Sequence, residues 1–297
     1  MKTIFITGAT GFVGSRVVKE LIGAGYKVLG LARSEAGAQA LAAAGAGVQR
    51  GMLEDVASLQ SGAAASDAVL HLGFIHDFSK FQENCEIDRR AIEALGAVLA
   101  GSDRPLIVTA GTAGLAAPGQ VATEDFVVPP NFPFPRVSEQ VALALRGVNA
   151  SVMRLPQVHD PVKQGLVTYL IALARAKGVS AYVGEGNNRW AAAHVSDVAH
   201  LYRLALEKHE AGAKYHAVDE EGVPMREIAE AIGRGLNVPV VSLSPDEAAA
   251  HFGWLTLFAG ADLVASSEKT RKKLGWNPTG PGLIADLQRM DYSEKAG

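Results

Sequence analysis

The sequence predicts an α/β fold, in which a doubly wound parallel sheet is followed by a smaller α/β region. Short apolar runs alternate with helix-length segments through the first half of the chain, the pattern of a parallel sheet with helices on both faces. A glycine-rich turn joins the first apolar run to the first helical segment. The 297 residues are 48% hydrophobic, a globular composition long enough for one large domain or two joined ones.

The apolar runs of the first half are continuous rather than alternating, as expected of parallel strands that are buried on both faces. We expect strands at 4–7, 26–32, 48–50, 68–72, 106–109 and 151–155. We expect helices at 12–24, 36–44, 86–99 and 138–145. The proline-rich segment 127–136 fits neither a helix nor a central strand, so we expect a loop that crosses the carboxyl edge of the sheet.

The pattern becomes less regular after Pro156, which places a domain boundary near 156–160. Helices are expected at 165–176, 195–206, 225–236, 245–254 and 267–274, and extended segments at 181–184, 214–218 and 239–243. We therefore divide the chain into regions 1–160 and 161–297. Some segments of the second region are expected to return to the first sheet.

Charge and cysteine content exclude several classes of function. The 28 basic and 31 acidic side chains give a net charge of −3, which provides no electrostatic attraction to nucleic acid or to an anionic membrane. Cys85 is the single cysteine, so neither an internal disulfide nor a cysteine-rich metal site is expected. No signal peptide, membrane span or metal-ligand spacing is recognised, and we expect a cytoplasmic protein without a metal.

The most informative motif is TGATGFVG at 7–14, which follows the first expected strand and opens a helix. Gly8 permits a tight turn, Gly11 lets the backbone approach a pyrophosphate, and Gly14 packs the helix on the strand. The helix N-terminus offers free N–H groups to phosphate. A purely structural glycine turn is the alternative, but the strand–turn–helix context favours a dinucleotide site. The expected cofactor-binding residues here are Gly8, Thr10, Gly11, Phe12, Val13 and Gly14.

This motif and four later segments resemble the extended branch of the short-chain dehydrogenase/reductase superfamily, the epimerases, dehydratases and reductases. The later segments are DAVLHLGF at 67–74, MRLPQVHDP at 153–161, GNNRWAAAHVSDV at 186–198 and SEKTRKKLGWNP at 267–278. The resemblance covers nearly the whole chain. It implies a Rossmann domain at 1–160 that binds a nicotinamide cofactor, and a substrate-binding region at 161–297.

The end of the second strand favours NADP(H) over NAD(H) as that cofactor. NAD enzymes typically place an acidic residue there for the ribose hydroxyls, and none occurs here before Glu35. Arg33 can pair with a 2′-phosphate and Ser34 can donate to it, although Arg33 could also be an ordinary solvated arginine. The resemblance further implies that Met52 and Leu53 flank the adenine, that Leu72, Gly73 and Phe74 back the ribose, and that Pro156 and Val158 face the nicotinamide.

The catalytic pair usual in this family is missing. Its chemistry uses Tyr-x-x-x-Lys on the helix after the fifth strand, where the lysine lowers the tyrosine pKa and the tyrosine transfers the proton. None of the six tyrosines has a lysine four residues later, and no tyrosine lies between Tyr26 and Tyr169. Pro135 or Arg136 stands at the tyrosine position. Asp88 stands where extended members often have asparagine, and Gly111 stands at the usual Ser/Thr position.

Three residues are candidates to replace that pair. Arg136 is a permanent cation that can stabilise an oxyanion, but it is a poor proton donor. His159 titrates in the range needed for acid catalysis, and Thr112 could hydrogen-bond a carbonyl. Each has a structural alternative: Arg136 could pair with Glu139, His159 could form a loop contact beside Asp160, and Thr112 could satisfy a turn.

Other polar and aromatic residues are weaker candidates. We interpret His76 and Asp77 as a polar loop near the cleft, and His194 and Asp197 as residues that orient the following helix. Five aromatic residues could wall an apolar substrate pocket, although such residues more often belong to the core. They are Phe132, Phe134, Tyr182, Trp190 and Trp254.

These observations predict an NADP(H)-dependent oxidoreductase that reduces a ketone, aldehyde or imine of small-molecule size without the usual proton relay. The alternatives are a non-catalytic NADP(H)-binding regulator and an epimerase or isomerase that retains its cofactor. The resemblance also implies a homodimer that pairs helices 86–99 and 138–146 across a two-fold axis. The apolar stripe Val141, Ala142 and Leu145 could support that contact or face the sheet instead.

Overall fold

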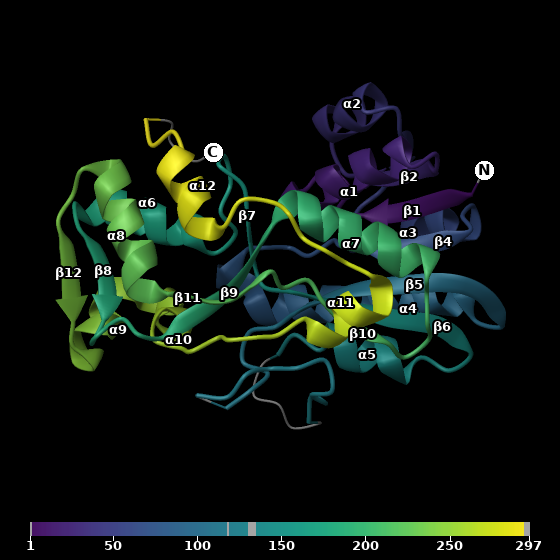
Figure 1. Ribbon diagram of the computed structural model, residues 1–297. Helices are drawn as coiled ribbons and strands as arrows, with labels where there is room; N and C mark the ends of the chain where they lie inside the picture. The colour runs from purple at the N-terminus through teal and green to yellow at the C-terminus, as the bar shows by residue number, and fades with distance from the viewer. Residues whose placement is uncertain (1, 118, 130–134, 294–297) are drawn as a thin grey trace.

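A seven-stranded parallel sheet forms the larger part of the computed structural model, which describes residues 2–117, 119–129 and 135–293 (Figure 1). The strand order is β10-β6-β5-β4-β1-β2-β3. The strands are β1 (Thr3–Thr7), β2 (Lys27–Ala32), β3 (Gly47–Arg50), β4 (Ala68–His71), β5 (Ser102–Gly111), β6 (Val148–Leu155) and β10 (Lys214–His216). This confirms the Rossmann-type doubly wound fold, in which ligands bind beyond the carboxyl ends of the strands where the order reverses.

Helices cover both faces of this sheet, and the alternating directions of the side chains along β1 show why. Ile4 and Ile6 are buried in one core with the helices α1 (Phe12–Gly23), α2 (Glu35–Ala43) and α7 (Val195–Glu207). Phe5, between them, points into a second core with α3 (Val56–Ala64), α4 (Phe81–Leu99) and α5 (Ser138–Ala144). Successive strand residues face opposite sides, so each apolar run supplies both cores.

The rest of the chain builds a smaller region beside the sheet (Figure 1). It contains a three-stranded sheet of β11 (Glu220–Pro224), β9 (Arg189–His194) and β7 (Gln157–His159), and a two-stranded sheet of β12 (Val240–Leu243) and β8 (Ser180–Val183). Its helices are α6 (Val167–Lys177), α8 (Met225–Leu236), α9 (Pro245–Phe252), α10 (Thr256–Ala259) and α12 (Leu283–Arg289), with short 3₁₀ turns at Phe78–Lys80 and Gly253–Leu255. The helix α11 (Glu268–Leu274) lies beside β10.

The chain returns from the second region to the large sheet. Strand β10 pairs with β6 at the sheet edge, and α7 packs on α1. The sequence patterns did not predict α3, α10, α12 or the short strands β7, β9 and β11. These strands have three to six residues, too few to show a period, and they pair only with one another. Phe132 and Phe134 lie outside the described residues.

The helix α5 bears on the predicted homodimer. Ala142 is fully buried in the core under the sheet, and the Leu145 side chain packs where Gly96 of α4 leaves space for it. Two members of the stripe are therefore used within one chain, while Leu143 beside them is 39% exposed. A homodimer thus stays a prediction, with Leu143 on its expected contact surface.

We expect light scattering at micromolar concentration to give twice the mass of one chain. Leu143→Glu should shift that mass toward a single chain, because burying a carboxylate at an apolar contact is unfavourable. Glu230→Gln on α8, away from this surface, is the matched control. A single-chain mass for the unaltered protein would contradict the prediction.

Candidate active site

The glycine turn between β1 and α1 has the geometry that a dinucleotide phosphate requires. Gly8 has φ +67°, and a Cβ there would lie 2.7 Å from the backbone nitrogen of Gly73 at the end of β4. A Cβ on Gly14 would collide with the Gly8 carbonyl, so the helix packs directly on the turn. The helix begins at Phe12 with no side-chain cap on its first amides. Those N–H groups are therefore available to a phosphate.

Part of this turn is exposed to solvent. Thr10 and Gly11 are exposed, and Phe12 and Val13 are partly buried. The backbone N–H of Gly11 donates to the Gly8 carbonyl at 2.9 Å, which closes the turn. The six residues that the motif predicted thus lie together in the turn after β1 and the first residues of α1, where Thr10 and Gly11 are exposed and Gly14 is buried.

The predicted 2′-phosphate residues follow β2. Arg33 is exposed and lies beside Ser34, whose hydroxyl caps α2 by accepting from the Gly37 amide at 3.1 Å. Arg50 at the end of β3 donates to the Ser34 carbonyl at 3.1 Å and pairs with Glu35 at 2.5 Å. Arg50 is not among the residues that the sequence motifs predicted. The feature that brings Arg50 to this place is the parallel pairing of β2 with β3, which sets Ala32 opposite Arg50.

The remaining cofactor candidates occupy the carboxyl ends of β3, β4 and β6. Leu53 is the side chain that a Cβ on Gly73 would meet, at 2.9 Å, and Met52 is 47% exposed. Leu72, Phe74 and Pro156 are partly buried, whereas Val158 is only 6% exposed and belongs to the core. The structure thus clusters Leu53 and Gly73 at the turn, while Val158 offers little accessible surface.

A buried chain of hydrogen bonds starts at this turn. The Gly73 N–H donates to the Thr7 hydroxyl at 3.0 Å, and Thr7 lies 2.8 Å from His71 Nδ1. His71 Nε2 lies 3.1 Å from Asp88 on α4. Because the Asp88 carboxylate can only accept, His71 donates to it from Nε2.

The same carboxylate anchors Arg136 from the other side. Ser138 at the start of α5 donates to Asp88 at 2.5 Å, and Arg136 Nε donates to Ser138 at 2.9 Å. Arg136 Nη2 also donates to the Thr109 carbonyl of β5 at 3.2 Å, and its guanidinium lies 4.1 Å from the centroid of the Phe74 ring. The Arg136 side chain is 21% exposed. It is therefore fixed on three sides and open on one.

The electrostatic environment keeps the Asp88 carboxylate of this network ionised. Burial alone would raise the pKa of Asp88, but the hydrogen bond from His71 and the nearby Arg136 charge outweigh it and hold that pKa below its ordinary value. Arg136 Nε lies 4.0 Å from the carboxylate. Burial raises the pKa of the neighbouring Cys85 thiol to about 11, which keeps it protonated and unreactive at neutral pH. The site thus presents one fixed cation, where the sequence suggested a pairing of Arg136 with Glu139.

Glu139 has another partner, and Thr112 satisfies a turn. Glu139 forms a buried ion pair with Arg154 of β6, at 2.5 Å and 2.7 Å. The Thr112 hydroxyl lies 3.4 Å from the Leu155 carbonyl, and its backbone N–H donates to the same oxygen at 3.0 Å. The structural alternative that the sequence left open for Thr112 fits these contacts.

His159 is the predicted site residue that lies farthest from water. Its side chain is fully buried, and Nδ1 lies 2.7 Å from Asp286 of α12. Burial lowers the pKa of His159 against the raising effect of Asp286. Its neighbour Asp160 instead binds Arg16 of α1, at 3.1 Å. The structure therefore does not bring His159 together with Arg136, and the ring lacks the exposure that a proton donor to substrate needs.

Aromatic rings connect the two regions near Arg136. Phe78, in the loop after β4, stacks on Trp254 with ring centroids 4.2 Å apart, and both contact Tyr169 of α6 edge-on. Trp254, a predicted pocket residue, is 41% exposed. The predicted Trp190 is buried instead, and its indole N–H donates to a backbone carbonyl. Trp254 therefore belongs to the aromatic wall and Trp190 to the core.

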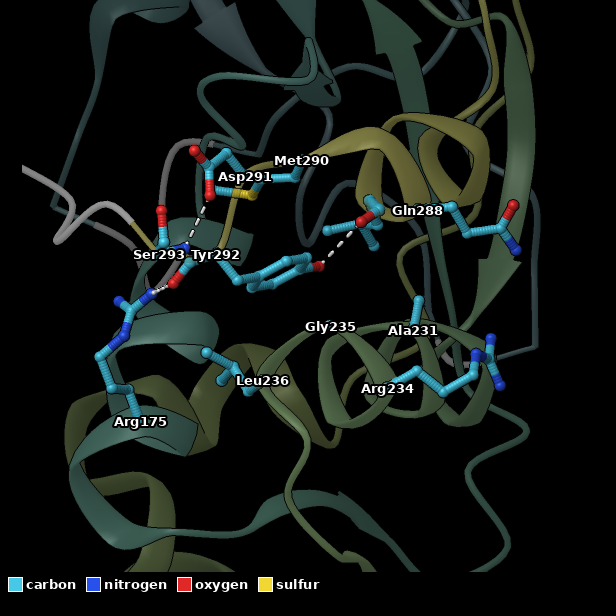
Figure 2. A pocket seen from close by; sticks show the side chains of 11 residues that line it. Arg175, Ala231, Arg234, Gly235, Leu236, Gln288, Met290, Asp291, Tyr292 and Ser293 are labelled. Atoms are coloured by element: carbon cyan, nitrogen blue, oxygen red, sulfur yellow. Dashed lines mark hydrogen bonds between the residues drawn. The ribbon is translucent and has the colours of Figure 1, made fainter.

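A separate surface hollow of about 800 Å³ lies among α6, α8 and α12 (Figure 2). The Tyr292 ring covers Gly235 on its floor, and Arg175 donates to the Tyr292 carbonyl at 2.8 Å. Its lining comes from the smaller region and includes none of the residues named above for the cofactor or for Arg136.

Within the described ranges, no group of three metal-ligating side chains is found. No helix of the described chain is long and apolar enough to cross a membrane.

Comparison with known proteins agrees with this geometry. Residues 4–219 match the NAD dependent epimerase/dehydratase family. An uncharacterized protein of Schizosaccharomyces pombe is 49% identical over 293 residues, which cover 97% of this chain and 99% of the relative. A decarboxylating sterol-4-alpha-carboxylate 3-dehydrogenase of Dictyostelium discoideum is 28% identical over 249 residues, covering 76% and 74%. UDP-glucose 4-epimerase of Thermus thermophilus, solved with NAD, has a TM-score of 0.74 at 18% identity, covering 99% and 100%.

These matches confirm the resemblance drawn from the motifs. The family match alone covers well over half of the chain, and it includes the glycine turn, Asp88 and Arg136. The fold likeness extends over almost the full length of the solved epimerase. This chain belongs to the NAD-dependent epimerase/dehydratase family.

Proposed function

We propose that this protein is an NADP(H)-dependent oxidoreductase that reduces a ketone, an aldehyde or an imine. The observation that carries the proposal is the anchored guanidinium of Arg136, which stands at the family's tyrosine position or one residue after it. The sterol dehydrogenase relative, which is named for oxidoreduction at a sterol C3, supports the reaction class.

The residues at the glycine turn fit the cofactor. A Cβ at Gly8 or Gly14 would fill the turn, and the uncapped start of α1 presents backbone N–H groups to a pyrophosphate. The adjacent carboxyl ends of β1 and β4 hold Thr7, Leu72 and Gly73, beside which the ribose would lie. When bound, the reduced nicotinamide supplies a hydride to the substrate carbon.

Arg136 would act on the substrate's oxygen or nitrogen. Its charge is permanent, and Asp88, Ser138 and the Thr109 carbonyl hold the guanidinium in one position. A fixed cation at the place where negative charge develops stabilises the transition state without reorganisation. Because hydrogen bonds to Ser138 and to the Thr109 carbonyl already use two of its N–H donors, the open edge of the guanidinium is the part available to substrate.

We expect NADPH to bind more tightly than NADH, because Arg33 is free to meet a 2′-phosphate and Glu35 is held by Arg50. Arg33→Ala should weaken NADPH binding about tenfold to hundredfold, the range of a hydrogen bond to a charged group, and leave NADH binding near its original value. Fluorescence titration with both cofactors measures this. Arg90→Ala on α4 is the control, and equal affinities for NADPH and NADH in the unaltered protein would contradict the prediction.

The proposed function is tested by NADPH oxidation across a panel of ketones, aldehydes and imines. Turnover that Arg136→Gln removes supports it. Tight NADPH binding with no turnover of any compound would favour the non-catalytic regulator instead. Interconversion of sugar epimers without net NADPH consumption would favour the epimerase.

A cytoplasmic location stays a prediction, which cell fractionation can check.

A further inference from the structure

We propose that His76 is the catalytic group that donates a proton to the substrate, in the place of the family's tyrosine. The inference rests on the proposed function, because it names the missing half of that reaction. Arg136 supplies charge but no readily released proton, so a reduction at this site requires a second group. That group has to lie near Arg136 and to reach water.

His76 is placed on the same aromatic ring as Arg136. The Phe74 ring holds the guanidinium 4.1 Å from its centroid, and the His76 ring meets Phe74 edge-on at 5.3 Å. On its other side His76 meets Phe78 at 6.3 Å, also edge-on. Phe78 in turn stacks on Trp254, so His76 lies between the anchored cation and the aromatic wall.

The side chain is also accessible. His76 is exposed, in the loop that leaves the carboxyl end of β4. His159, by contrast, is fully buried on Asp286, and Tyr202 is fully buried against Thr109. His76 can therefore recover a proton from solvent after each turnover, which neither buried group can do.

The surrounding charges make its imidazolium a stronger acid. Packing of the ring against its neighbours lowers the pKa of His76, and the positive charges of Arg136 and Lys163 lower it further, against a hydrogen bond with the Phe74 backbone that raises it. The acidic side chain beside it is Asp77, which is occupied in capping Ser79 at 2.6 Å and 3.0 Å. A protonated histidine that is repelled by two positive charges releases its proton more readily than a free imidazolium does.

The step balances as a two-electron reduction. The substrate carbon gains a hydride from the reduced nicotinamide, and the C=O π electrons move to oxygen beside Arg136. The oxygen then takes the N–H proton of the His76 imidazolium, which leaves a neutral imidazole and an alcohol. The neutral imidazole regains a proton from water before the next turnover.

The test compares His76→Asn and His76→Ala with the unaltered enzyme on a carbonyl substrate identified from the panel. We expect kcat to fall by about 10²- to 10⁴-fold, the usual contribution of general acid–base catalysis. Added imidazole should restore part of the rate in His76→Ala, because the site is open to solvent. His251→Asn is the matched control, since burial also lowers the pKa of His251 while its ring contacts Phe252 rather than Phe74.

Two readouts separate this role from a structural one. In the unaltered enzyme, kcat should rise as pH falls through the His76 pKa, and the rise should vanish in His76→Asn. In the protein without cofactor, NMR titration of the His76 ring should show a pKa below 6.5 that increases in Arg136→Gln, because a neighbouring positive charge is removed. This measurement needs no activity.

The possible results distinguish the inference from the function on which it rests. An active enzyme whose kcat and pH profile survive His76→Asn would overturn the inference and leave the proposed function standing. An unaltered protein that turns over no compound would overturn the function itself, and the proposed role of His76 with it. A His76 pKa that does not respond to Arg136→Gln would show that the two side chains do not share a site.

Discussion

Replacing Arg136 with glutamine is expected to lower kcat by about 10²- to 10³-fold, the cost of removing one preorganised group that stabilises developing charge. Glutamine can still hydrogen-bond Ser138, so the start of α5 should keep its position. NADPH affinity should change less than kcat, because the contacts of Arg136 include one predicted cofactor residue, the Phe74 ring, and none of the glycine turn. Steady-state kinetics together with cofactor titration measure both quantities.

Arg136→Lys provides a sharper comparison, because lysine keeps the charge and loses the planar fork. The guanidinium uses Nε for Ser138 and Nη2 for the Thr109 carbonyl, and one ammonium cannot occupy both positions and still face substrate. We expect a rate between those of the unaltered enzyme and Arg136→Gln. Arg89→Gln, at a partly buried arginine of α4 that pairs with Glu86, is the control. Equal rates for the unaltered enzyme, Arg136→Lys and Arg136→Gln would exclude Arg136 from the reaction.

Replacing Glu139 with alanine is expected to reduce the free energy of unfolding by about 3–5 kcal/mol, the usual cost of leaving a buried charge without its partner. Arg154 is fully buried, and Glu139 binds its guanidinium through both carboxylate oxygens. The remaining contacts of Arg154, the carbonyls of Thr123 and Phe126 and the ring of His216, carry no compensating negative charge. Urea denaturation followed by circular dichroism measures the loss.

The control for Glu139 is an ion pair of the same type in water. Glu93 binds Arg89 at 2.5 Å on α4, where its side chain is 47% exposed, and solvent screens such a pair. Glu93→Ala should therefore cost far less than Glu139→Ala. If Arg154→Met is added to Glu139→Ala, part of the lost stability should return, because no charge then remains buried. Equal losses for Glu93→Ala and Glu139→Ala would refute this account.

The architecture and the glycine turn between β1 and α1 could both be predicted from the amino-acid sequence. Apolar runs that are continuous over four or more residues identify strands covered on both faces, and this information is local to each run. The glycine spacing at 8, 11 and 14 is equally local, since each glycine answers a steric demand made by residues close by in the chain or on the next strand. The absence of Tyr-x-x-x-Lys was also readable without a structure.

Which polar side chains contact one another could not be predicted from the sequence. Glu139 is the acidic residue nearer to Arg136 in the chain, three residues away, yet its carboxylate binds Arg154. Arg136 is instead anchored through Ser138 to Asp88, which lies 50 residues before that serine. His159 finds its acid in Asp286, 127 residues away, rather than in the adjacent Asp160. Hydrogen bonds require contact within about 3 Å in a fixed direction. Helix packing on the sheet sets those directions, and sequence spacing does not encode them.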